Sequence, residues 1–176
     1  DLTRAETLKK TLLMAEQQQR RDMREYVDFD VEIWAAASIA KAFDQLKLPY
    51  DRTEKDTPSF TKNFLREHPH PFPKLVVHCR ALNKMNTTFI DTILKYNYKG
   101  RIHADINQIR SDDGGTVTGR FSYSNPNLQQ IPARHKIIGP MIRSLFLPEE
   151  DHTWGCFDYS QQEPRILVHF ASLMRL

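Results

Sequence analysis

The sequence predicts an α+β fold, in which a helical first part up to about residue 99 precedes a second part of antiparallel strands and helices. Two observations support this class. Apolar residues recur at helical spacing through most of the first part, and after Gly100 they alternate with polar residues as in a strand. The chain has 176 residues, 40% of them hydrophobic and 27% charged, which suits one or two compact units with a buried core.

Three helices are expected before residue 70. Apolar positions three or four residues apart predict a helix over 1–26 and a second over 35–46, which Pro49 closes. A polar loop is expected over 51–57. Ser59 is the expected N-cap of a short third helix that ends near Leu65, before a run of prolines.

The longest helix is expected from about Lys74 to Tyr96. Its apolar stripe consists of Leu75, Cys79, Leu82, Met85, Phe89 and Ile93. Another face carries hydrogen-bond donors in near-helical register, namely Arg80, Lys84, Thr87 and Lys95. These donors could follow a phosphate backbone. A solvated charged face is the alternative, because most charged helix faces bind nothing.

The second part is expected to open with a hairpin. Alternation over 102–106 predicts a strand, 112–115 a turn, and 116–122 the returning strand. A loop containing two prolines follows over 125–134. Flat donor and acceptor side chains gather here, in the segment from Thr118 to Arg120 and in Asn127, Gln129 and Gln130. Such groups suit base edges, although a polar hairpin edge explains them equally well.

The end of the sequence predicts a short helix at Pro140, a buried strand over 154–157 and a helix from Glu163 onward. Asp158 lies where this strand would give way to a turn. A carboxylate fixed in that way can hold Mg²⁺ together with substrate phosphates. From the strand–Asp–helix order alone, a helix cap or a surface turn is the competing interpretation.

Composition limits the setting. Net charge is +3 and the pI about 8.9, so the chain is mildly basic. Cys79 and Cys156 each stand alone, which favours a reducing intracellular setting. No apolar run is long enough to span a bilayer, and no signal peptide is recognisable, so no membrane partner is expected. The chain starts without methionine and stops inside an amphipathic run, so we expect it to be part of a longer protein.

Taken in order, these segments resemble the family A (Pol I-like) DNA polymerases. The ten residues from Phe157 to Ile166 (FDYSQQEPRI) resemble the family's motif A. Further matching blocks are Thr118–Ser122 (TGRFS), Pro126–Pro132 (PNLQQIP), Arg101–His103, and the thumb-like segments Phe43–Pro49, Thr53–Lys55 and Arg80–Phe89. The resemblance covers nearly the whole chain. Gln162 and Pro164 depart from motif A in a way that is similar to phage or organelle members.

The resemblance implies a fragment of a DNA-directed DNA polymerase, a DNA-binding nucleotidyltransferase of replication or repair. Residues 1–99 would be the thumb and residues 100–176 the first part of the palm, ending just after motif A. The implied partners are primer–template DNA, deoxynucleoside triphosphates and the remainder of the polymerase. The implied place of action is the bacterial cytoplasm or a phage-infected host, with an organelle as a further candidate.

The resemblance also implies roles for single residues. Asp158 would be catalytic and would bind two Mg²⁺ ions, with the backbone carbonyl of Tyr159 as a further ligand. The incoming nucleotide would meet Ser160, Gln161, Glu163 and Arg134, with Glu163 excluding a 2′-hydroxyl. DNA would meet Arg80, Lys84, Asn86, Thr87, Arg120, Asn127 and Gln129. Arg120 would test the minor-groove edge, whose acceptors are nearly the same for every correct pair.

Three alternatives remain open. The family also needs a fingers helix and a second palm aspartate, and neither motif occurs in this sequence. We therefore expect the isolated chain to bind DNA weakly and not to extend primers. A non-catalytic DNA-binding remnant, or one piece of a split polymerase, is the second interpretation. A single-subunit RNA polymerase is the third, and the thumb-like segments and Glu163 argue against it.

Overall fold

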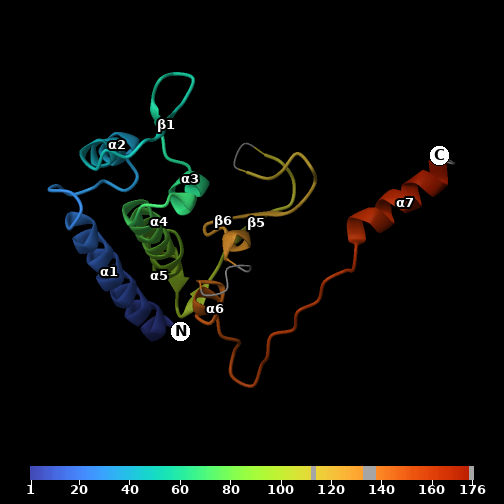
Figure 1. Cartoon of the computed structure of the whole chain (residues 1–176). Coiled ribbons are helices and arrows are strands. Elements are labelled where there is room, and N and C mark those ends of the chain that lie inside the picture. Colours follow the sequence, from blue (N-terminus) through green and yellow to red (C-terminus); the bar gives the residue numbers. More distant parts are fainter. Residues whose placement is uncertain (112–113, 133–137, 175–176) are drawn as a thin grey trace. The chain divides into compact units, whose positions relative to one another are not determined.

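The computed structural model describes residues 1–111, 114–132 and 138–174. The chain forms two compact units, Asp1–Phe146 and Leu147–Leu176. Figure 1 shows the elements of each unit, coloured along the sequence.

The first unit is mainly helical. Its helical elements are α1 (Leu2–Arg24), α2 (Ala36–Gln45), α3 (Lys62–Glu67), α4 (Pro71–Lys84), the π-helix η1 (Met85–Ile90), α5 (Asp91–Lys95), the 3₁₀ turn η2 (Leu128–Gln130) and α6 (Ile138–Arg143). α4, η1 and α5 follow one another without a break and form one long helix. Two of the starts have a clear local cause: Asp1 caps α1 by accepting from the Arg4 N–H, and prolines occupy the first turn of α4.

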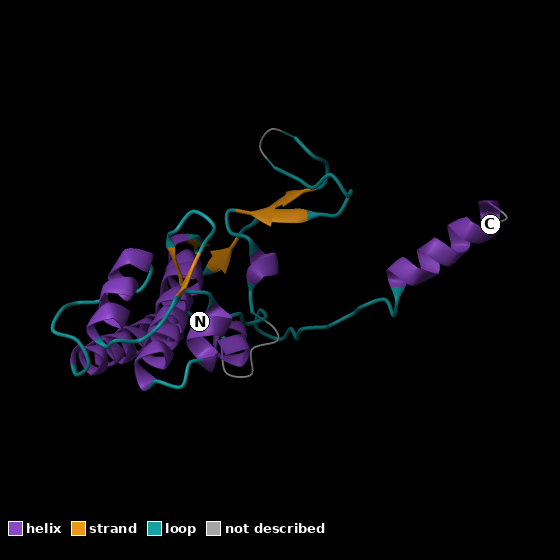
Figure 2. Cartoon of the chain, turned by 45° about the horizontal axis from the view of Figure 1, so that its top comes forward, coloured by secondary structure: helices purple, strands orange, loops and turns teal. Residues whose placement is uncertain are grey.

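Three short antiparallel strand pairs complete this unit (Figure 2). β1 (Asp51–Arg52) pairs with β2 (Pro58–Ser59), β3 (Asn97–Tyr98) with β4 (Arg101–Ile102), and β5 (Asp105–Asn107) with β6 (Ser122–Ser124). In the β3–β4 turn, φ is 50° at Lys99 and 79° at Gly100. Two consecutive positive φ values are typical of a two-residue hairpin turn.

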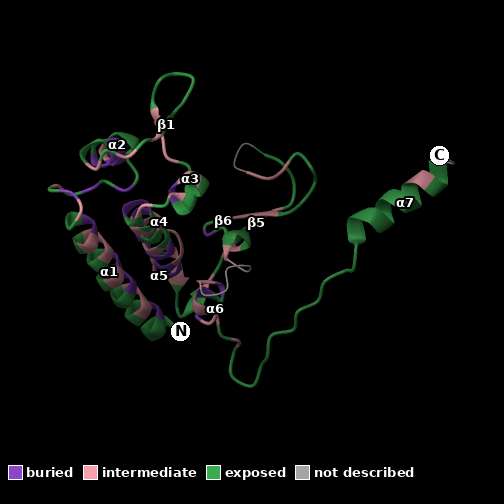
Figure 3. Ribbon diagram, viewed as in Figure 1, coloured by how far each residue is buried: buried purple, intermediate pink, exposed green. Residues whose placement is uncertain are grey.

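Two hydrophobic clusters form the core of the first unit (Figure 3). The first joins the end of α1 to α2, α3 and α4, and consists of Met23, Val27, Val31, Ile33, Ile39, Ala42, Phe43, Leu65, Phe72, Val76 and Cys79. The second joins the start of α1 to η1, α5 and α6, and consists of Ala5, Leu12, Met85, Ile90, Ile93, Ile142 and Leu145. α1 therefore runs antiparallel to the long helix and contributes to both clusters.

Polar contacts fix α1 along the long helix. Lys9 Nζ lies 2.6 Å from an Asp91 carboxylate oxygen. Near the middle of α1, Asn83 donates from Nδ2 to both carboxylate oxygens of Glu16, at 3.3 and 3.2 Å. These contacts lie along the length of α1 and set its register.

The second unit contains one described helix, α7 (Gln162–Met174). The residues before it are extended and exposed. The predicted buried strand over 154–157 was wrong, because Trp154 is 65% and Phe157 97% exposed and neither lies in a strand. A strand needs a partner for its backbone hydrogen bonds, and the described residues of this unit include no second strand.

The α+β class is confirmed, and so are the helices expected in the first part. Two details differ. The cap of α3 is Thr61, whose hydroxyl accepts from the Phe64 N–H at 3.2 Å, whereas Ser59 lies in β2. The predicted returning strand over 116–122 pairs only through 122–124. The predicted turn over 112–115 lies partly outside the described residues, and Ser111 and Gly114 pair across it.

Candidate nucleic-acid and metal-binding residues

Arg80 is the most constrained of the predicted DNA-binding residues. Its Nε donates to the Ile33 carbonyl at 2.6 Å, and Nη1 lies 3.4 Å from the Phe60 carbonyl. Its guanidinium carbon lies 5.2 Å from the centroid of the Trp34 ring. Burial lowers the pKa of Arg80 below its ordinary value, although the group stays charged at neutral pH. Arg80 therefore links α4 to two loops, and two of its nitrogens are already engaged by backbone carbonyls.

The π-helix η1 determines how the following residues are presented. A π turn holds one more residue than an α turn and is frequent at functional sites. Thr87 is exposed and donates from its hydroxyl to the Asn83 carbonyl at 2.9 Å. Asn86 is only 4% exposed, and its Oδ1 has no hydrogen-bond partner among the described residues. Lys84, the last residue of α4, is exposed.

The Thr118–Arg120 segment and the loop after β6 come together through Gln129. Its Nε2 donates to the Phe121 carbonyl at 3.1 Å, and its own N–H donates to Asn127 Oδ1 at 3.1 Å. Gly119 has a φ of 72°, in the left-handed region that glycine adopts at no steric cost. Arg120, Asn127 and Gln129 are all exposed on this hairpin and loop.

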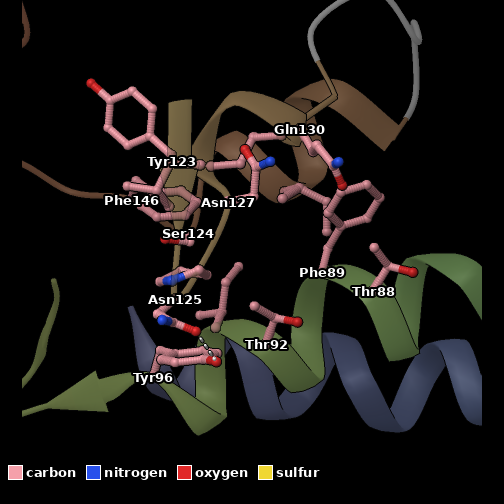
Figure 4. Close-up of a pocket in the computed structure, with 15 residues that line it drawn as sticks. Thr88, Phe89, Thr92, Tyr96, Tyr123, Ser124, Asn125, Asn127, Gln130 and Phe146 are labelled. Carbon is pink, nitrogen blue, oxygen red and sulfur yellow. Dashed lines mark hydrogen bonds between the residues drawn. The ribbon is translucent and has the colours of Figure 1, made fainter. Parts of the chain in front are cut away.

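Beside this loop the first unit has a pocket of about 470 Å³, lined by residues of η1, α5, β6 and η2 (Figure 4). The Tyr96 hydroxyl donates to Asn125 Oδ1 at 3.1 Å across it. Asn127 lines the same pocket. The long helix and the loop of the PNLQQIP segment thus share a surface, which the sequence did not reveal.

The second unit holds the candidate metal-binding residues. Asp158 and Tyr159 are exposed and lie directly before the turn at Ser160. Gln161 has a φ of 52°, and its carbonyl accepts from the Arg165 N–H at 3.1 Å, which opens α7. Glu163 lies in the first turn of α7. The backbone thus turns sharply between Asp158 and Glu163, and both side chains belong to one exposed segment.

The residues present are the chemical type of ligand that a magnesium ion needs, but they are too few to complete its coordination. A carboxylate and a backbone carbonyl are the hard oxygen ligands that Mg²⁺ prefers. Among the described residues, however, no group of three or more acidic, histidine or cysteine side chains could enclose a metal. Asp158 therefore supplies one carboxylate of a site that needs further ligands.

The structure therefore groups the predicted residues into three sets: Arg80 to Thr87 on the long helix, Arg120 to Gln129 on the hairpin and loop, and Asp158 to Glu163 before α7. Arg134 lies outside the described residues. Sequence reasoning missed Trp34 and Lys62, which lie close to Arg80. A large aromatic residue next to an expected helix start was the available signal.

Comparisons with known proteins identify the family of the chain. The model of the DNA polymerase family A matches residues 3–176. A DNA-directed DNA polymerase of Pseudomonas phage M6 is 37% identical over 151 residues, covering 82% of this chain and 23% of its own length. The DNA polymerase DpoZ of Salmonella phage PMBT28 is 33% identical, covering 88% and 28%. The thermostable DNA polymerase I of Thermus aquaticus is 39% identical, covering 73% and 16%.

Among solved structures, the POL domain of Pol1 from M. smegmatis, in complex with DNA primer-template and dNTP, is similar with a TM-score of 0.78 and 26% identity. The match covers 98% of this chain and 30% of that one. The chain thus spans about a quarter of the length of the phage relatives it matches. No helix in the described part of the chain is long and apolar enough to cross a membrane. Since the family model matches almost every residue, the chain belongs to DNA polymerase family A.

Proposed function

We propose that this chain is the part of a DNA-directed DNA polymerase that binds the primer–template duplex and supplies the first catalytic carboxylate. Residues 1–99 are the thumb in this proposal, and residues 100–176 the first part of the palm. The observation that carries it is the segment Asp158–Glu163, exposed and sharply turned before α7, in a chain that the family model matches over 3–176.

In this proposal Asp158 binds Mg²⁺ with the Tyr159 carbonyl. When bound, the metal ions activate the primer 3′-hydroxyl and stabilise the leaving pyrophosphate. A second carboxylate comes from another segment of the natural polypeptide. Ser160, Gln161, Glu163 and Arg134 hold the incoming deoxynucleotide, and Glu163 excludes a 2′-hydroxyl.

The duplex meets two of the three sets in the proposal. Lys84, Thr87 and Arg80 hold backbone phosphates, with Asn86 beside them. Arg120 reads the minor-groove edge, while Asn127 and Gln129 position the strands. Phage and bacterial relatives support a place of action inside a bacterial cell, infected or not.

The test is primer extension by the natural polypeptide that contains this sequence. Asp158→Asn keeps the size of the side chain and removes its charge. We expect activity to fall at least about a hundredfold, because metal stabilisation is worth several kcal/mol and 1.36 kcal/mol is a factor of ten. Duplex affinity should stay unchanged, because the duplex contacts lie elsewhere.

Asp151→Asn is the matched control. Asp151 is exposed in the same unit and has a φ of 62°, a conformation that asparagine also tolerates. It should extend primers normally. Normal extension by the Asp158→Asn variant would exclude the catalytic role and leave a DNA-binding remnant as the function. Extension by the 176-residue chain alone would show that no further carboxylate is needed.

A further inference from the structure

Trp34 is a large exposed side chain that is nevertheless fixed in place. It is 58% exposed, yet its single polar atom, Nε1, donates to Asn83 Oδ1 at 3.0 Å. Asn83 in turn donates to Glu16, which is only 7% exposed and is paired with Arg20 at 2.9 Å. A chain of hydrogen bonds anchored in the interior therefore orients the indole.

The Arg80 guanidinium lies over the same ring, 5.2 Å from its centroid, and its Nε is occupied by the Ile33 carbonyl. Arg80 thus positions Trp34 and contributes positive charge beside it. Exposed tryptophan and arginine are the residue types that most often dominate binding surfaces. An oriented, exposed indole is accordingly a candidate contact residue.

Trp34 lines a cavity of about 500 Å³ that also touches Lys62, Arg80 and Lys84. No acidic side chain belongs to its described lining. Lys62 and Lys84 are exposed, and neither forms an ion pair with a described carboxylate. The cavity therefore combines one aromatic surface with three positive charges, and its volume lies in the range of small-ligand pockets, roughly 300–1,000 Å³.

We propose that this cavity binds one unpaired nucleotide of a DNA strand. The base stacks on the Trp34 ring, and the adjoining phosphates meet Lys62 and Lys84. A base inside a duplex has both faces covered by its neighbours, whereas an unpaired base offers a face to an indole. Aromatic side chains beside cations are how proteins hold single strands without sequence preference. The inference rests on the proposed function in one respect, that the ligand is DNA.

The test measures binding of a fluorescent oligothymidylate and of a fluorescent, fully paired duplex of two annealed strands to the whole chain by anisotropy. Trp34→Leu should weaken oligothymidylate binding about tenfold, since stacking is worth about 1–3 kcal/mol per base. Trp34→Phe keeps an aromatic surface and should lose less. Tyr98→Leu is the matched control: Tyr98 is 63% exposed and lies outside the cavity lining, so its loss should change affinity by less than about twofold.

Tryptophan emission gives a second measurement that needs no change at Trp34. The sequence contains two tryptophans, and Trp154→Phe leaves Trp34 alone. Oligothymidylate should quench this emission, and the fully paired duplex should quench it less. Emission from this variant that stays unchanged when the oligonucleotide is added would overturn the proposal.

Equal losses of single-strand and duplex affinity in Trp34→Leu would also overturn it, in favour of a duplex contact. None of these measurements involves nucleotide transfer. An Asp158→Asn variant that extends primers would refute the proposed function, and the binding measurements would stay the same. Conversely, Trp34→Leu with unaltered oligothymidylate binding would end this inference and leave the proposed function standing.

Discussion

Replacing Arg80 with alanine should destabilise the first unit as well as weaken DNA binding. The variant removes the donor to the backbone carbonyl of Ile33, a residue that is 1% exposed. It also removes the cation over the Trp34 ring. A hydrogen bond from a charged donor is worth about 1.5–3 kcal/mol, and an exposed cation–π contact about 0.5–1 kcal/mol. The 3.4 Å contact to Phe60 contributes little at that length. Because Arg80 is partly exposed, we expect a loss near the lower end, about 2 kcal/mol in the free energy of unfolding.

Urea unfolding followed by circular dichroism measures this loss. With a slope of about 2 kcal/mol/M, the midpoint should fall by about 1 M at an unchanged slope. Lys84→Ala is the control, since Lys84 is exposed and unpaired with any described carboxylate, and its stability should change by less than about 0.5 kcal/mol. A variant Arg80→Ala as stable as the unaltered chain would refute the packing role described here.

The same two variants separate stability from phosphate contact. Each is expected to weaken duplex binding for all sequences and to reduce the salt slope by about one. If Arg80→Ala loses stability but keeps its salt slope, Arg80 is a structural residue only, and Lys84 is left to meet the phosphate.

Further predictions follow from the core and from two groups with shifted pKa values. Phe43→Ala should cost about 3–5 kcal/mol in thermal or urea unfolding, because Phe43 is fully buried and contacts several other aromatic rings; a loss below about 1 kcal/mol would contradict the packing. Burial raises the pKa of the Cys79 thiol to about 11, so at pH 8 a thiol reagent should modify exposed Cys156 quickly and Cys79 only on unfolding. Burial, with repulsion from a neighbouring histidine, lowers the pKa of His68, so the unfolded chain takes up the proton more readily and stability should fall as pH drops below about 6.5. His68→Asn should flatten that pH dependence, because asparagine does not titrate and can still accept the same backbone N–H.

The helices were predictable because their causes are local. Apolar spacing marks α1 and α2. The long helix was expected from about Lys74 but begins at Pro71, because the first turn of a helix needs no N–H partner and therefore admits prolines. The predicted cap of α3 was wrong by two residues, because serine and threonine are both good caps and the sequence does not choose between Ser59 and Thr61. Ser59 cannot be the cap because it pairs with Asp51 in the β1–β2 hairpin.

The rest depends on contacts between distant segments. The strand expected at Trp154 needs a partner strand, and the described part of the second unit has none. The hydrogen bond from Trp34 to Asn83 joins residues 49 positions apart, so no local sequence pattern predicts it. The roles of Asp158 and Glu163 likewise come from the family resemblance and stay predictions, since exposure and a sharp turn do not by themselves specify a metal.

The π turn between Met85 and Ile90 also determines how the long helix responds to changes in length. Deleting one residue from an ordinary α-helix rotates everything after it by about 100°, which here would carry Ile93 out of its cluster and Asp91 away from Lys9. Within η1 the surplus residue can be lost by a return to α-helical hydrogen bonding, with the flanking helices kept in place. Single-residue length differences among chains of this kind should therefore be tolerated at 85–90 and rejected in α4 and α5.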